Sequence, residues 1–179
     1  NIMRVSLDKV RGEYQGVIFD FVNRLQTGCI RHVFGKDGTL WVGQTGRGWG
    51  SAGGKEFGLQ QVKWDGKTTP FSMHDVKLTK EGFRITFTKP VDVTLAKDAE
   101  KYSVERWGYH YHPKYGSPKT NVTKEKPANV KVSKDGLEVH IGVTLEKSRV
   151  YKLNLGALAA QDGSKLANAY AWYTLNQLK

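Results

Sequence analysis

Three turns of the same composition constrain the fold of this chain more than any other feature. Each consists of a lysine, an acidic residue and a glycine, at Lys36-Asp37-Gly38, Lys80-Glu81-Gly82 and Lys134-Asp135-Gly136. Glycine adopts the positive φ that a tight turn needs, and Asp-Gly is a strong hairpin signal. Apolar residues alternate with polar ones on both sides of each turn, as in strands with one buried face. The sequence therefore predicts three β-hairpins.

Helical patterns are nearly absent from the rest of the chain. Only the short segments 98–102 and 155–160 could form a turn of helix, whereas alternation of period two recurs at 83–87, 139–141 and 150–155. Such alternation is typical of strands that bury one face. We therefore expect an all-β fold.

The glycine content of the chain changes near residue 70. Thirteen of the 20 glycines lie in residues 1–66, and the remaining residues have the strand spacing of a β-sandwich. The segment 71–179 is close to the usual size of an immunoglobulin-like (Ig-like) sandwich of about 100 residues. We predict two regions, a Gly-rich antiparallel sheet in residues 1–70 and an Ig-like sandwich in residues 71–179.

The composition limits the possible partners and locations. The net charge of +11 would suit an acidic partner, but the basic residues are dispersed and never occur three in a row, so nucleic acid is not expected. The single cysteine, Cys29, excludes an internal disulfide. No apolar run approaches the roughly 20 residues of a membrane-spanning helix. The chain begins at Asn1 without a signal peptide, and we expect a processed product or part of a longer polypeptide.

A Gly-rich segment, LWVGQTGRGWGSAGGKEFG, contains the pattern G-x-G-x-x-G at residues 48–53. A dinucleotide site needs a helix after these glycines, but residues 55–64 contain Gly58 and have the pattern of a strand. A P-loop is excluded because Trp49 and Glu56 stand where glycine and Ser or Thr are required. The segment is predicted to connect two antiparallel strands without holding a nucleotide.

A second segment, ERWGYHYHPKYGSP (residues 105–118), concentrates aromatic residues and histidines. On a strand, His110 and His112 would share a face and could both meet one metal ion, although spacing indicates no third ligand. For Trp107 and Tyr109 we favour packing in the core or against another domain. A surface platform for a sugar ring remains the alternative for the aromatic residues of this segment.

The candidate ligand-binding residues come from both segments. Arg47 and Trp49 could present a cation and a ring to a sugar or an acidic group, or could simply stack on each other. Tyr111, His112 and Tyr115 could form a surface site for carbohydrate. We expect no catalysis from this chain alone, since no paired carboxylates and no catalytic triad share a motif.

Two stretches carry a resemblance to a known family. GCIRHVFGKDGTLWVGQTGRGWG, with YQGVIFDF (residues 14–21) before it, resembles the closing blade of bacterial glucose/sorbosone-dehydrogenase-like six-bladed propellers. LTKEGFRITFTKPVD and the C-terminal VYKLNLGALAAQDGSKLANAYAWYTLN resemble the Ig-like module that often follows such a propeller. The resemblance implies a propeller-blade-like sheet followed by an Ig-like sandwich, in a periplasmic or extracellular multidomain protein.

The same resemblance implies a function for the whole protein more than for this chain. The chain would be a non-catalytic C-terminal portion that braces the propeller or binds carbohydrate, with the rest of the propeller as its partner. Alternatively, it would be part of a sugar oxidoreductase that uses pyrroloquinoline quinone (PQQ), is active only with the complete propeller, and passes electrons to a cytochrome c. Only about one blade is present, so no cofactor-binding residue is assigned here.

Overall fold

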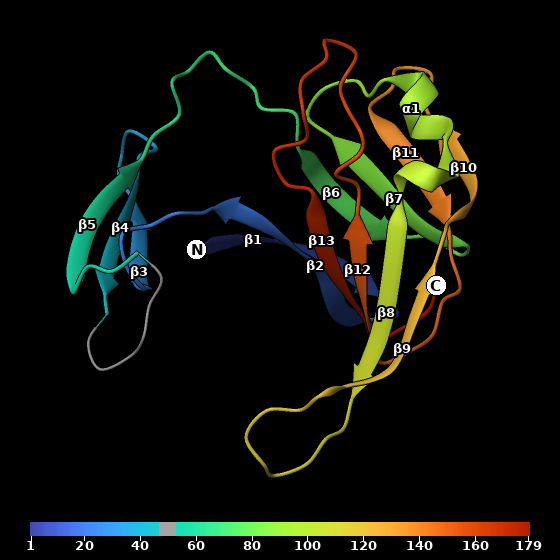
Figure 1. Cartoon of the computed structure of the whole chain (residues 1–179), viewed down its shortest axis with the longest axis horizontal. Coiled ribbons are helices and arrows are strands. Elements are labelled where there is room, and N and C mark those ends of the chain that lie inside the picture. Colours follow the sequence, from blue (N-terminus) through green and yellow to red (C-terminus); the bar gives the residue numbers. More distant parts are fainter. Residues whose placement is uncertain (47–52) are drawn as a thin grey trace. The chain divides into compact units, whose positions relative to one another are not determined.

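The computed structural model of the chain describes residues 1–46 and 53–179. These residues form β-strands joined by turns, with one short α-helix and one 3-10 helix (Figure 1). The elements are β1 (Ile2–Val10), β2 (Glu13–Val22), β3 (Cys29–Phe34), β4 (Leu40–Thr45), β5 (Phe57–Val62), β6 (Met73–Leu78), β7 (Gly82–Phe87), α1 (Val93–Lys97), η1 (Ala99–Lys101), β8 (Ser103–Tyr109), β9 (Lys119–Glu125), β10 (Ala128–Val132), β11 (Glu138–Gly142), β12 (Arg149–Asn154) and β13 (Tyr170–Leu175). The prediction of an all-β fold is confirmed.

All three Lys-acid-Gly turns join antiparallel strands, as predicted. They connect β3 to β4, β6 to β7 and β10 to β11. Gly38 and Gly136 have φ angles of 78° and 70°, in the left-handed region that favours glycine. As predicted, a strand and not a helix follows the glycines of the Gly-rich segment: this strand is β5, which pairs with β4 in antiparallel register.

The contacts within the chain divide it into two compact units. The first contains residues 1–4 and 20–68, and the second contains residues 5–19 and 69–179. The division therefore passes through β1 and β2 as well as between Thr68 and Thr69. The assignment of residues 1–70 and 71–179 to separate domains stays a prediction.

The second unit contains a β-sandwich. One sheet has the strand order β1-β2-β13-β12-β8-β9, and the other has the order β10-β11-β7-β6. Strand β2 pairs with β13 in the first sheet. Val17 and Phe19 of β2 are fully buried and lie opposite Tyr173 and Ala171 of β13, so both strands turn the same face toward the core. The N-terminal strands that we expected in the Gly-rich sheet of residues 1–70 therefore contribute to this sandwich instead.

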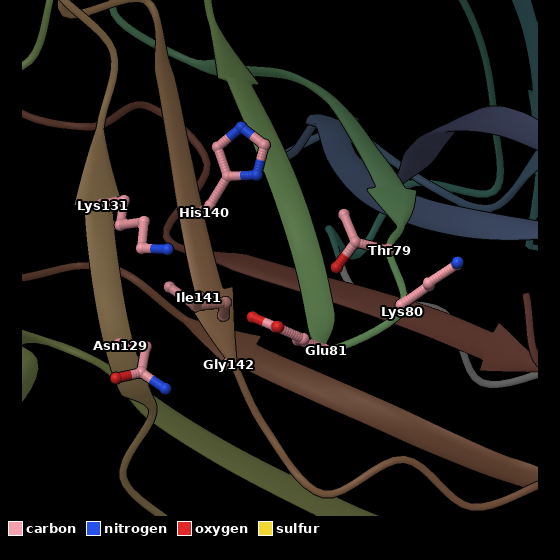
Figure 2. Close-up of a pocket in the computed structure, with 8 residues that line it drawn as sticks. All are labelled: Thr79, Lys80, Glu81, Asn129, Lys131, His140, Ile141 and Gly142. Atoms are coloured by element: carbon pink, nitrogen blue, oxygen red, sulfur yellow. The ribbon is translucent and has the colours of Figure 1, made fainter.

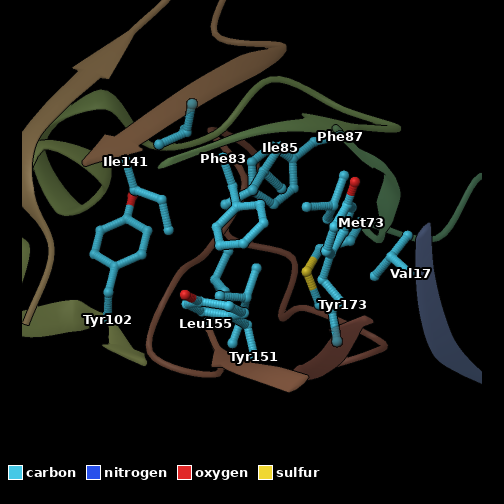
Figure 3. Close-up of a cluster of buried hydrophobic side chains, with 14 of the residues drawn as sticks. Val17, Met73, Phe83, Ile85, Phe87, Tyr102, Ile141, Tyr151, Leu155 and Tyr173 are labelled. Carbon is cyan, nitrogen blue, oxygen red and sulfur yellow. The ribbon is translucent and has the colours of Figure 1, made fainter. Parts of the chain in front are cut away.

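Aromatic side chains fill the space between the two sheets. Phe83 from β7 lies at the centre, with its ring centroid 5.3 Å from that of Tyr151 and 5.0 Å from that of Tyr173 (Figure 3). All three side chains are fully buried. Tyr151 and Tyr173 come from neighbouring strands of the opposite sheet, so these contacts hold the two sheets together.

One edge of the core contains a buried polar network. The hydroxyl of Tyr173 donates to Oδ2 of Asp8 at 2.9 Å and accepts a hydrogen bond from Nε2 of Gln15 at 3.0 Å. The same Asp8 oxygen accepts from the backbone N–H of Leu78, on the opposite sheet, at 2.9 Å. Because buried polar groups are costly when unpaired, this network specifies how β1, β6 and β13 pack.

Two aspartates cap the starts of the two helices. The side chain of Asp92 accepts hydrogen bonds from the backbone N–H groups of Thr94 and Leu95 at the start of α1. The side chain of Asp98 does the same for Glu100 in η1. Each carboxylate satisfies N–H groups that a helix start leaves unpaired.

The first unit contains a three-stranded sheet with the order β3-β4-β5. One of its faces is buried, where Leu40 and Val42 of β4 pack with Ile2 and Leu25. The opposite face is rich in exposed apolar side chains, namely Val33, Trp41, Phe57 and Leu59. The register places these four side chains on one face, since Val33 pairs with Trp41 while Leu59 and Phe57 pair with Gly43 and Thr45.

Candidate functional site

The connection between β8 and β9 presents the most exposed aromatic side chains of the described residues. Tyr109 and Lys119 form the last cross-strand pair, and residues 110–118 form a long loop beyond it (Figure 1). The side chains of Tyr111 and Tyr115 in this loop are completely exposed. Inside the loop, the backbone N–H of Lys114 donates to Nδ1 of His112 at 3.2 Å. We call residues 110–118 the hairpin tip.

The structure brings three of the predicted ligand-binding residues together in the hairpin tip, namely Tyr111, His112 and Tyr115. The other two, Arg47 and Trp49, lie outside the described residues. Nothing in the fold tests whether any of these five binds a ligand, and that assignment stays a prediction.

His110 and His112 would share a face, and could meet one metal ion, only if both lay on a strand. Strand β8 ends at Tyr109, so the alternation that would place both imidazoles on one face does not extend to them. Among residues 1–46 and 53–179, no group of three or more His, Cys, Asp and Glu side chains is arranged to hold a metal ion.

Trp107 and Tyr109 lie outside the apolar cluster between the two sheets, so neither packs in that cluster; packing against another domain, the other arrangement that we favoured, stays a prediction. Val104 faces the core, so by alternation Trp107 and Tyr109 lie on the opposite, outer face of the six-stranded sheet. Tyr109 is 53% exposed. Trp107 is only 3% exposed; the Nζ atom of Lys119 lies 3.6 Å from the centroid of its ring, and the ring of Tyr109 stands edge-on to it with the centroids 6.4 Å apart.

The indole of Trp107 has an unusual feature. Its Nε1 atom is buried and has no hydrogen-bond partner among the described residues. A buried donor without an acceptor costs about 1–3 kcal/mol.

Further lysines and aromatic rings lie on the same outer face. The Nζ atom of Lys152 lies 4.4 Å from the centroid of Tyr170, whose own centroid is 6.0 Å from that of Trp172. Such cation–π contacts contribute about 0.5–1 kcal/mol at exposed sites. We call this surface the lysine–aromatic face; it consists of Glu105, Trp107, Tyr109, Lys119, Lys124, Lys152, Tyr170 and Trp172.

A single carboxylate lies among these lysines. Oε1 of Glu105 accepts a hydrogen bond from Nζ of Lys119 at 2.8 Å, and Nζ of Lys124 lies 4.0 Å from its other oxygen. The hydrogen bond from Lys119, together with the positive charges of Lys119 and Lys124, lowers the pKa of Glu105. Sequence reasoning missed these lysines because only the strand register brings residues 105, 119 and 152 together.

The side chain of Arg106 lies on the opposite face of β8 from those of Glu105 and Trp107 and forms a separate cluster of ion pairs. Its side chain is 11% exposed, and its guanidinium contacts Glu125 at 2.5 Å and Glu146 at 3.0 Å. Hydrogen bonds from Arg106 and Arg149 lower the pKa of Glu146. This cluster ties β8 and β9 to the loop before β12 at the base of the hairpin.

A pocket of about 250 Å³ lies at the end of the four-stranded sheet (Figure 2). Lys131 and His140 are direct cross-strand neighbours in its wall, and Lys80 and Glu81 come from the turn between β6 and β7. Both signs of charge are present, and Lys80, Glu81 and Lys131 are exposed, so the pocket indicates no particular ligand.

Comparisons with known proteins indicate little about function. No protein-family model matches the chain, and no curated protein matches it. Among solved structures, the chain is similar to the surface layer protein SbsC, domains 1–6, and to the S-layer protein rSbsC(31-844). In both cases the TM-score is 0.46, the identity is 23%, and 62% of this chain is covered. The chain spans 14% of the length of the SbsC chains that it matches.

These comparisons show that the expected relationship to glucose/sorbosone dehydrogenases is wrong. The proteins found are S-layer proteins, and no propeller or sugar dehydrogenase is among them. Residues 14–21, which resembled a strand before the closing blade, lie in β2, and β2 pairs with β13 of the sandwich. PQQ, the rest of a propeller and cytochrome c had no basis other than this resemblance. In the part of the chain that the structure describes, neither helix has the length of a membrane span.

Proposed function

We propose that this chain is a non-catalytic module with a structural role in a larger extracellular protein, and that it attaches to carbohydrate through the hairpin tip. Similarity to a surface layer protein is compatible with an extracellular location. The proposed role needs no cofactor. It includes an Ig-like character for the sandwich of residues 71–179, which the two antiparallel sheets facing each other across an apolar core support.

The complete exposure of Tyr111 and Tyr115 is the observation that carries this proposal. A ring that remains in water contributes nothing to the core, whereas burial of aromatic surface is normally a large favourable term. Two such rings within five residues form an apolar surface that a sugar ring can cover, which releases water from both partners. His112 lies between them and can supply a hydrogen bond to a hydroxyl group.

The base of the hairpin suits a binding role because it is held firmly. Arg106 forms ion pairs with two glutamates there, and Lys119 covers the ring of Trp107. A tip on a fixed base loses less conformational freedom on binding than a free loop.

The test compares the double variant Tyr111→Ala/Tyr115→Ala with the wild-type chain on a panel of insoluble and soluble polysaccharides, both neutral and acidic. We expect the double variant to lose retention while its free energy of unfolding stays within about 0.5 kcal/mol, since both side chains are exposed. Tyr14→Ala is the matched control, because Tyr14 is 63% exposed but lies on β2. Equal retention of the double variant and the wild type would show that the hairpin tip does not bind carbohydrate.

A further inference from the structure

The lysine–aromatic face continues directly from the hairpin tip across the sheet. Strand register places Lys124 opposite Glu105, Glu105 opposite Lys152, and Lys152 opposite Trp172. These residues therefore form one row across β9, β8, β12 and β13, since opposite residues in antiparallel pairs lie side by side on one face. Lys119 stands opposite Tyr109, between this row and the hairpin tip.

Positive charge dominates this surface. The row and its neighbour contain three lysines and one glutamate, a formal charge of 3 − 1 = +2. The adjoining hairpin tip contains Lys114 and two histidines but no acidic residue. Because the whole chain also carries a net charge of +11, this face attracts anions.

The contacts of the lysines leave room for a carboxylate. Lys152 lies over Tyr170, and such a contact is weaker than an ion pair in the same setting. Lys119 lies over Trp107 and already donates to Glu105 at 2.8 Å, but an ammonium group carries three donors, so it can also pair with a second carboxylate. A ligand that carries both apolar ring faces and carboxylate oxygens suits the exposed rings of the hairpin tip and these ammonium groups together.

From these observations we propose that the ligand is an acidic polysaccharide, whose sugar rings stack on the tyrosines of the hairpin tip and whose carboxylates pair with Lys119 and Lys152. This inference rests on the proposed function, because it names the class of carbohydrate for the same site. The polymer runs from the tip onto the sheet, so several weak contacts act together in one binding event. A nucleic acid is also a polyanion, but every cation of the lysine–aromatic face is a lysine, and arginine is the residue that matches phosphate in a bidentate manner.

The test uses polygalacturonate and its fully methyl-esterified form, two polymers with the same backbone and different charge. We expect the wild-type chain to bind polygalacturonate about tenfold more tightly, and this preference to decrease as salt screens the ion pairs. The variant Lys119→Met/Lys152→Met keeps the aliphatic stems over the rings and removes both charges. Its affinity for polygalacturonate should fall about fivefold, because each exposed ion pair contributes little.

Lys9→Met is the matched control for this variant. Nζ of Lys9 lies 5.3 Å from the ring of Tyr14, so the pair has the same chemistry, but it lies on β1 and β2 at the other end of the strand order. Affinity should stay within about twofold of the wild type. Equal binding of the two polymers would overturn the acidic class and leave carbohydrate binding by the hairpin tip intact. Binding of neither polymer would overturn the inference, and tighter binding of an oligonucleotide of equal charge would assign the face to nucleic acid instead.

Discussion

Replacement of Tyr173 by phenylalanine tests the polar network that fixes the edge of the sandwich. The change removes one hydroxyl group and keeps the ring, which lies 5.0 Å from that of Phe83. It deletes the hydrogen bond to Asp8 and the one from Gln15. Gln15 keeps the contact of its Nε2 with the backbone oxygen of Gln177 at 3.1 Å, and Asp8 keeps the N–H of Leu78.

The magnitude follows from these two bonds. A hydrogen bond to a carboxylate contributes about 1.5–3 kcal/mol and a neutral one about 0.5–1.5 kcal/mol, so the free energy of unfolding should fall by about 2–4 kcal/mol. For a chain of this size that loss lowers the melting temperature by about 5–15 °C. Urea unfolding, followed by near-ultraviolet circular dichroism, measures the change as a lower midpoint with an unchanged slope.

Tyr170→Phe is the control, because it makes the same chemical change on the outer face. Tyr170 is 37% exposed, and its ring remains available to Lys152. Its free energy of unfolding should therefore stay within about 0.5 kcal/mol of the wild type. If Tyr173→Phe is as stable as Tyr170→Phe, the buried network does not stabilise the fold and the reasoning is refuted.

Three further outcomes are expected. Burial raises the pKa of Tyr102, and burial together with the negative charge of Asp8 raises the pKa of Tyr173. The folded state therefore favours the neutral phenols. Their contribution to stability is complete below the ordinary tyrosine pKa of 10.0 and is lost as the pH rises above it. Unfolding free energies at about pH 8 and about pH 11 measure this loss, and a flat profile would contradict it. Phe83→Ala should cost about 3–5 kcal/mol in urea unfolding because it empties the centre of the core, and a loss below about 1 kcal/mol would disprove that position. Gly82→Ala should cost about 1–3 kcal/mol, since a Cβ there would lie 2.0 Å from the backbone oxygen of Ile141; wild-type stability of this variant would show that the strands can separate without cost.

Local features of the fold could be predicted because they depend on neighbouring residues. The three Lys-acid-Gly turns lie within the short segments that they connect, so backbone preference and alternation sufficed to identify the hairpins. The exposure of Tyr111 and Tyr115 agrees with the surface position proposed for them, since Gly116 and the prolines around them interrupt the strand. The relationship to propellers that we inferred from short motifs was wrong, because alternating apolar and polar residues next to glycine occur in many antiparallel sheets.

The candidate site depends on information that no local pattern contains. Alternation shows that Trp107 and Tyr109 share a face, but it does not show which face meets the core, so packing in the core and packing against another domain both stayed open. Only the burial of Val104 and the pairing of β8 with β12 decide the question. A shift of one residue in register would exchange the two faces of the strand.

By itself, the sequence determined the all-β class and the positions of the three hairpins, because turn chemistry and period-two alternation act over a few residues. Only the tertiary structure decided that β1 and β2 complete the six-stranded sheet, since the pairing of β2 with β13 joins residues about 150 positions apart. It also decided that Lys119 and Lys152 lie over aromatic rings on one surface. The physical reason is that strand partners and register are set by the burial of the whole core, to which each strand contributes only a part.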